Sequence, residues 1–148
     1  MVDIKQIHLT IDGEPVVVAE GTTIMSAAKQ IGIKIPSLCY HPYLSVEGAC
    51  RICIVAVSGI KDYVASCAYP VAEGMDVETH NPEIRQARRD ITELILDNHP
   101  DDCHTCDRNS NCELQRLAYN MGVRTQHFKG EKKKYKKDSS SHSVVRDP

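Results

Sequence analysis

The chain has 148 residues, of which 41% are hydrophobic and 26% charged, enough to form the core of one domain with an appendage. Aromatic residues make up only 5%, so aliphatic side chains must build most of that core. Apolar runs such as 16–19 are far shorter than the roughly 18 residues that cross a bilayer. Residues 1–5 also lack the charged-then-apolar plan of a secretion signal. We therefore expect no membrane span and a cytoplasmic location.

The net charge of −2 conceals two regions of opposite sign. Residues 1–128 carry 11 Lys and Arg against 17 Asp and Glu, whereas residues 129–148 carry seven against three. The lysine run at 132–137 could attract nucleic acid or an anionic membrane. Only Tyr135 interrupts it and no base-reading motif accompanies it, so a flexible basic linker is favoured and no nucleic-acid partner is expected.

The first third of the chain predicts a hairpin followed by a helix. Residues 5–11 alternate apolar and polar, Asp12-Gly13 is a strong turn signal, and 16–18 returns as the second strand. Thr22 or Thr23 can cap a helix over 24–31, with Gly32 ending it.

The middle of the chain predicts a long loop and more strands. Residues 36–49 contain Pro, Ser, Gly and Tyr and are typical of a loop, whereas 52–57, 63–67 and 75–78 are typical of strands. One helix among several strands makes a small α+β unit over residues 1–79.

A helical appendage is expected over residues 80–128. Asn81 and Pro82 begin a helix that ends near Asn98, and a second helix starts at 112, capped by Asn111. We expect the first helix to bury its aliphatic stripe and to turn its charges outward; the stripe is Ile84, Ala87, Ile91, Leu94 and Ile95. Residues 129–148 are expected to form a tail.

The seven cysteines divide into two groups. Four of them have the spacing C-x10-C-x2-C-x13-C, and they are Cys39, Cys50, Cys53 and Cys67. The other three follow a histidine in the spacing H-x3-C-x2-C-x5-C, and this set is His99, Cys103, Cys106 and Cys112. An odd number of thiols with no secretion signal argues against a disulfide scaffold, and thiols in a reducing compartment are often metal ligands.

Two metal chemistries fit these ligands. Thiolates on a loop can hold an iron–sulfur cluster, with a C-x2-C pair on neighbouring corners and a distant cysteine closing the other side. Zinc takes the same ligand types, but usually through two C-x2-C pairs, and the first group has only one. Spacing therefore favours iron–sulfur at the first group and leaves the second open between iron–sulfur and zinc.

A family resemblance enters on these motifs. Residues 35–40 (IPSLCY), 48–53 (GACRIC) and Cys67 resemble the 2Fe–2S domain of the complex I 75 kDa (NuoG-type) subunit family. Residues 99–106 (HPDDCHTC) and 112–115 (CELQ) resemble the following segment of that family, in which one His and three Cys hold a 4Fe–4S cluster. Iron-only (FeFe) hydrogenase catalytic subunits, NAD-linked formate dehydrogenases and diaphorase-side subunits of bidirectional hydrogenases share both modules.

The resemblance implies a β-grasp ferredoxin fold with one 2Fe–2S cluster and one 4Fe–4S cluster. It implies that the 2Fe–2S ligands are Cys39, Cys50, Cys53 and Cys67. It implies that the 4Fe–4S ligands are His99, Cys103, Cys106 and Cys112. The implied function is single-electron relay inside an oxidoreductase, foremost an NAD(H)- or ferredoxin-linked iron-only hydrogenase, with no catalytic centre in these residues.

The implied partners are other parts of such a complex, namely an NADH- and flavin-binding subunit and further ferredoxin-like clusters. Residues 139–148 resemble the linker that in iron-only hydrogenases leads into a two-cluster ferredoxin domain. We therefore expect the chain to be a piece of a larger subunit rather than a free-standing carrier.

Other candidate residues have plainer interpretations. His104 could replace His99, but its place inside the C-x2-C turn favours a side chain that points away. His41 is expected to be a loop residue, because a ligand role would leave one cysteine unused. Arg51 could offset cluster charge or lie exposed. Asp101 and Asp102 are expected to shape a turn, and the remaining histidines are expected at the surface; they are His8, His80, His127 and His142.

Overall fold

A computed structural model describes residues 5–125, 127–128, 130, 136 and 138–145. The predicted hairpin is present as β1 (Gln6–Ile11) and β2 (Glu14–Ala19), which pair antiparallel. Asp12 and Gly13 form the turn with φ values of 51° and 83°, the left-handed conformation that a tight hairpin turn requires. The predicted lysine run lies largely outside the described residues.

Five strands form one mixed sheet in the order β2-β1-β5-β3-β4. The remaining strands are β3 (Ile54–Val57), β4 (Val64–Ala65) and β5 (Met75–Glu78), and β5 runs parallel to β1 and antiparallel to β3. β3 and β4 are shorter than the predicted strands at 52–57 and 63–67. Cys53 and Cys67 therefore lie just outside the ladder, on backbone that turns away from it.

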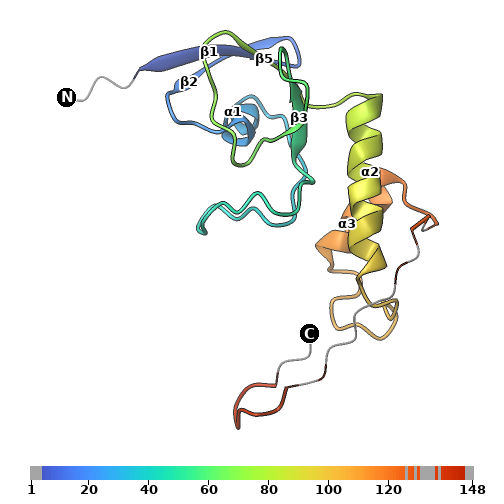
Figure 1. The fold of residues 1–148 in the computed structure, drawn as a ribbon. Helices are drawn as coiled ribbons and strands as arrows, with labels where there is room; N and C mark the ends of the chain where they lie inside the picture. Colours follow the sequence, from blue (N-terminus) through green and yellow to red (C-terminus); the bar gives the residue numbers. More distant parts are fainter. Residues whose placement is uncertain (1–4, 126, 129, 131–135, 137, 146–148) are drawn as a thin grey trace.

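Helix α1 (Ile24–Gln30) lies against this sheet (Figure 1). The hydroxyl oxygen of Thr23 accepts the Ser26 amide at 3.3 Å, so Thr23 rather than Thr22 is the cap. The buried core joins the helix to the sheet and is almost entirely aliphatic, as the composition predicts; its largest fully buried members include Ile11, Ile24, Val55 and Val77. The α+β class is confirmed.

Two helices follow the sheet. α2 (Pro82–Asp97) begins where predicted, with the Asn81 side chain accepting the Ile84 amide at 2.6 Å. α3 (Glu113–Met121) packs across α2, and α2 also contacts β3 (Figure 1).

The predicted cap of α3 is wrong. Cys112, not Asn111, is the cap residue: it is extended (φ −116°, ψ 124°), and its carbonyl accepts the Arg116 amide at 3.1 Å. Its side chain caps nothing, so Glu113 in the first turn supplies the favourable charge at this helix end.

The predicted buried face of α2 is also wrong. The buried residues of this helix are Ile84, Arg88, Thr92 and Glu93, whereas Leu94 is 49% exposed. Only Ile84 belongs to both sets. The neighbours of α2 offer polar partners, a backbone edge and the segment after α3, and these select the polar side chains.

Candidate metal centres

The first group of cysteines gathers beside the start of β3. Cys53 and Cys67 are buried, and their sulfur atoms lie 3.3 Å apart. Cys39 and Cys50 are half-buried, and the Cys50 amide donates to the Cys39 sulfur at 3.5 Å. All seven cysteines are free, and a disulfide would bring two sulfur atoms to about 2.05 Å. The structure therefore presents two close pairs of thiols rather than disulfides.

The backbone around Cys50 is bent to make this approach possible. Gly48 and Arg51 both have left-handed conformations, with φ values of 60° and 58°. A Cβ on Gly48 would lie 3.6 Å from the Cβ of Ala68 and 4.0 Å from that of Ala65, so only small side chains line this turn. The bend returns the chain so that the half-buried thiols face the buried pair.

The side chain of Arg51 is exposed, and its Nη2 donates to the Tyr63 carbonyl at 3.4 Å. This guanidinium therefore fastens the cysteine turn to the segment that enters β4.

The electrostatics of the four thiols suit a positively charged group among them. Burial, assisted by the neighbouring thiols Cys53, Cys39 and Cys50, raises the pKa of Cys67 to about 12. Burial also opposes ionisation of Cys50, but backbone hydrogen bonds, first from Ile52, outweigh it and lower its pKa. Charges on the four sulfur atoms thus act on one another, and cationic iron would stabilise the thiolates together.

The second group lies on the loop between α2 and α3. Cys103, Cys106 and Cys112 are half-buried, whereas His99 and His104 are exposed. The His99 amide donates to the Leu96 carbonyl at 3.0 Å, which places this histidine directly after the end of α2.

Successive turns shape that loop. The Asp102 carbonyl accepts the Thr105 amide at 2.9 Å, and the Cys106 carbonyl accepts the Asn109 amide at 2.9 Å. The Arg108 amide donates to the Cys106 sulfur at 3.4 Å, a hydrogen bond of the kind that stabilises a thiolate. The part of the chain that the structure describes contains no three His, Cys, Asp or Glu side chains arranged to hold a single metal ion. The second ligand set is therefore close in the chain, on one loop, without a preformed single-ion geometry.

The other candidate residues lie apart from both groups or at the surface. His41 is exposed, and its Nδ1 accepts the Tyr43 amide at 3.3 Å within the loop. His8, His80 and His142 are exposed as expected.

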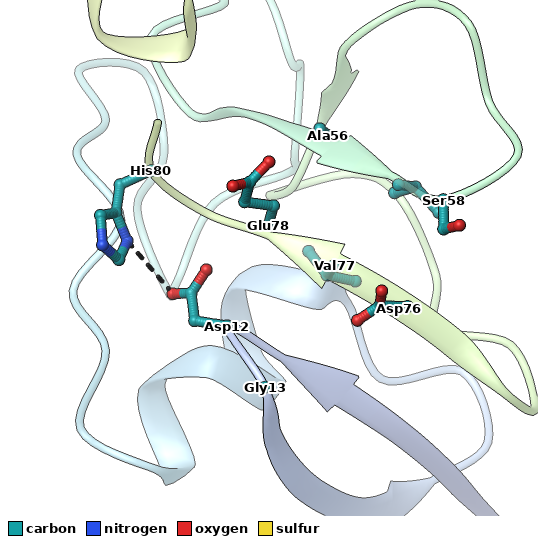
Figure 2. A pocket seen from close by; sticks show the side chains of 9 residues that line it. Asp12, Gly13, Ala56, Ser58, Asp76, Val77, Glu78 and His80 are labelled. Atoms are coloured by element: carbon teal, nitrogen blue, oxygen red, sulfur yellow. Dashed lines mark ion pairs between the residues drawn. The ribbon is translucent and has the colours of Figure 1, made fainter. Parts of the chain in front are cut away.

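A surface pocket of about 530 Å³ lies at the far end of β3, and none of its lining residues is a cysteine (Figure 2). His80 stands at its rim with Nδ1 3.4 Å from a carboxylate oxygen of Asp12. Asp12 in turn accepts the Thr79 amide at 2.7 Å. This acidic hollow supports the turn between strands and does not belong to the cysteine sites.

Two contacts of α2 were missed by the sequence reasoning. Arg88 is buried and donates from Nη2 to the carbonyls of Ile54, at 2.6 Å, and Thr79, at 3.0 Å. Glu93 is also buried, and its carboxylate accepts from Arg89 Nε at 3.1 Å and pairs with His127 Nδ1 at 2.9 Å. No periodicity marks either residue, because their partners are backbone carbonyls and a segment remote in sequence.

Two family models match the chain. Residues 4–82 match the 2Fe–2S iron–sulfur cluster binding domain. Residues 88–127 match the NADH-ubiquinone oxidoreductase-G iron–sulfur binding region, whose model is a 4Fe–4S one.

Curated relatives agree with these matches. The chain is 42% identical over 130 residues to the NuoG-type subunit of NADH-quinone oxidoreductase from Rickettsia bellii, covering 88% of this chain and 19% of the relative. It is also 42% identical over 149 residues to the NADP-reducing hydrogenase subunit HndD of Solidesulfovibrio fructosivorans, covering 97% of this chain and 25% of the relative. The chain thus spans a quarter or less of the length of these two relatives.

A solved structure also resembles the fold. A chain in the crystal structure of an NAD+-reducing [NiFe]-hydrogenase in the H2-reduced state superposes with a TM-score of 0.87 at 32% identity. The match covers 96% of this chain and 60% of that chain. Within the described residues, no helix is both long and apolar enough to cross a bilayer.

Proposed function

Because the chain belongs to the family of 2Fe–2S iron–sulfur cluster binding domains, we propose that it relays single electrons between two clusters inside a larger oxidoreductase. A 2Fe–2S and a 4Fe–4S cluster supply one-electron redox chemistry when bound. The protein's part is to hold the ligands, to limit access of water and to set the potentials. The observation that carries the proposal is the convergence of two thiol pairs beside β3, with sulfur atoms of Cys53 and Cys67 3.3 Å apart.

The 2Fe–2S ligands in this proposal are Cys39, Cys50, Cys53 and Cys67. Each iron of such a cluster takes two protein ligands, and the structure offers two pairs. Cys39 and Cys50 are joined by an amide-to-sulfur bond of 3.5 Å, and Cys53 and Cys67 by their 3.3 Å separation. We assign one pair to the outer, half-buried iron and the other to the inner iron.

The 4Fe–4S ligands in this proposal are His99, Cys103, Cys106 and Cys112. All four lie between the last turn of α2 and the first residue of α3, so the two helices fix the ends of the binding loop. The domain limits that follow are 1–79 for the 2Fe–2S unit, 80–128 for the helical 4Fe–4S unit and 129–148 for the basic tail.

The proposed setting is a complex that exchanges electrons with NAD(H) or NADP(H). The relatives are named as subunits of an NADH-quinone oxidoreductase and an NADP-reducing hydrogenase. We propose an iron-only hydrogenase as the first candidate parent, with a flavin-containing, NADH-binding subunit and further ferredoxin-like clusters as partners. Seven unpaired thiols suit a reducing, cytoplasmic compartment.

Anaerobic purification with iron, acid-labile sulfide and visible-absorption analysis tests the function. Two plus four irons should give about six irons and about six sulfides for each chain, with a brown colour. The Cys53→Ala variant should retain about four irons and the Cys106→Ala variant about two, since each loses one cluster. A colourless protein that contains zinc would overturn the electron-relay proposal.

A further inference from the structure

Arg88 is a buried cation next to the proposed 2Fe–2S site. Its side chain extends from the middle of α2 toward the start of β3, and the residue is 6% exposed. Nη2 donates to the Ile54 carbonyl at 2.6 Å, and Ile54 directly follows Cys53 in the chain. The guanidinium therefore grips the backbone immediately after a proposed ligand.

The same guanidinium also holds the entrance to α2. Nη2 donates to the Thr79 carbonyl at 3.0 Å, in the segment that joins β5 to α2. One side chain thus connects three elements of the fold: β3, the end of β5 and the helix that leads to the second ligand loop.

These hydrogen bonds leave the charge of Arg88 without a direct anionic partner. Among the described residues, no carboxylate forms an ion pair with it, and its Nε is buried without a hydrogen-bond partner. A buried cation of this kind is unfavourable unless negative charge lies nearby. The negative groups whose charge acts on it are Cys53 and, more weakly, Asp12.

A 2Fe–2S cluster with four thiolates supplies that charge. The assembly is negative in both oxidation states, and it gains one more negative charge when it accepts an electron. A fixed cation a short distance away in a region of low dielectric constant stabilises the reduced state more than the oxidised state. Its effect is therefore to raise the potential.

We propose that Arg88 is a positioning residue that raises the redox potential of the 2Fe–2S cluster by holding one buried positive charge beside Cys53. This inference depends on the proposed 2Fe–2S site and adds the residue that sets its potential. The second cluster should respond less. Nine residues of helix separate Arg88 from Asp97 at the end of α2, a distance of about 14 Å along the axis.

The test is an EPR-monitored redox titration of the anaerobically purified chain and four variants. Arg88→Gln and Arg88→Met remove the charge at similar length, and Arg88→Lys keeps it. Arg85→Gln is the matched control, because Arg85 lies one turn earlier on α2 and is exposed. The neutral variants should lower the 2Fe–2S potential and leave the 4Fe–4S potential almost unchanged, whereas the Lys and Arg85 variants should retain both.

Each alternative result decides the matter. An unchanged 2Fe–2S potential in either neutral variant overturns the proposal, as does a Lys variant whose potential falls with the neutral ones. If only the neutral variants fail to incorporate the cluster while the Lys variant has the original potential, the charge requirement is supported. A chain without any 2Fe–2S signal before mutation would instead contradict the proposed function, so the two failures are distinguishable.

Discussion

At the scale of single residues, the backbone of Arg51 matters more than its side chain. A left-handed conformation costs a residue other than glycine about 1–3 kcal/mol, and such strain is found chiefly at functional sites. Arg51 adopts it at φ 58° between the two cysteines of the C-x2-C pair. Its side chain meanwhile lies outside and contacts the Tyr63 carbonyl. The strained backbone is what allows Cys50 and Cys53 to face the same place.

The assignment of His99 as a ligand yields a prediction about potential. The His99→Cys variant should keep the 4Fe–4S cluster but lower its potential, by on the order of 100 mV, because a thiolate adds one negative charge. His99→Ala should lose the cluster or change its EPR signal. The measurement is a redox titration monitored by EPR.

His104 supplies the matched control for that experiment. It is exposed like His99 and lies on the same loop, so His104→Ala should leave the signal and the potential as they were. The opposite pattern, an unaffected His99→Ala and an altered His104→Ala, would transfer the ligand role to His104.

At the scale of elements, α2 shows what hydrophobic spacing can predict and what it cannot. Its start and end follow from Asn81, Pro82 and the signals after Asn98, and both were predicted correctly. Its buried face was not predicted, because Arg88 and Glu93 are buried by specific hydrogen bonds rather than by apolar contact.

The candidate sites show the same division. The cysteine spacing indicated two groups, and the structure brings the first together in two pairs beside β3. Spacing alone left iron and zinc open at the second group, since both accept a histidine and three thiolates. The left-handed turn at Arg51 was not predicted either, because an arginine gives no local signal for that conformation.

Glu93 yields a prediction about the segment that follows α3. Its carboxylate accepts from the His127 ring at 2.9 Å and from the His127 amide at 3.2 Å, and chiefly the ring contact holds its pKa below the usual value. Glu93→Gln should weaken the attachment of this segment to α2 by about 1–2 kcal/mol at neutral pH. Trypsin cleavage after Arg124, followed by mass spectrometry, should then be about 5–30 times faster.

The pH dependence of this attachment follows from the lowered pKa of Glu93. A carboxylate with a lowered pKa in the folded state contributes stability at neutral pH and loses it as the pH falls through that pKa. Hydrogen exchange of the His127 amide in the original chain should therefore approach that of Glu93→Gln below about pH 4.5. Glu83→Gln, an exposed carboxylate on the same helix, should change neither result; equal effects of both variants would contradict the role of Glu93.

At the scale of the whole molecule, the aliphatic core and the proposed cluster loops are separate sources of order. The core joins α1 to the sheet, whereas residues 41–47 of the first cysteine loop are all exposed. Tyr43 at 89% and Leu44 at 69% exposure contribute almost nothing to a core. Bonds from iron to the thiolates must therefore supply most of the order of this loop.

Removal of iron should accordingly loosen the loops before the sheet. After anaerobic treatment with a chelator, hydrogen exchange over 37–53 and 98–112 should rise by about tenfold or more, corresponding to a loss of at least about 1.4 kcal/mol. Exchange over β1 and β2 should change much less. Simultaneous loss of protection in the sheet would show that the core depends on the clusters.

The rigidity of α2 has a consequence for the rate of electron transfer. The probability that an electron tunnels between two centres falls steeply with their separation, so a fluctuating linker would produce a broad distribution of rates. Here a hydrogen-bonded helix of 16 residues, fastened to β3 through Arg88, leads from one ligand set to the other. Adding one residue between Arg88 and Asp97 would advance the second loop by about 1.5 Å and rotate it by about 100°. The number of residues in α2 thereby fixes both the tunnelling distance and the relative orientation of the two centres.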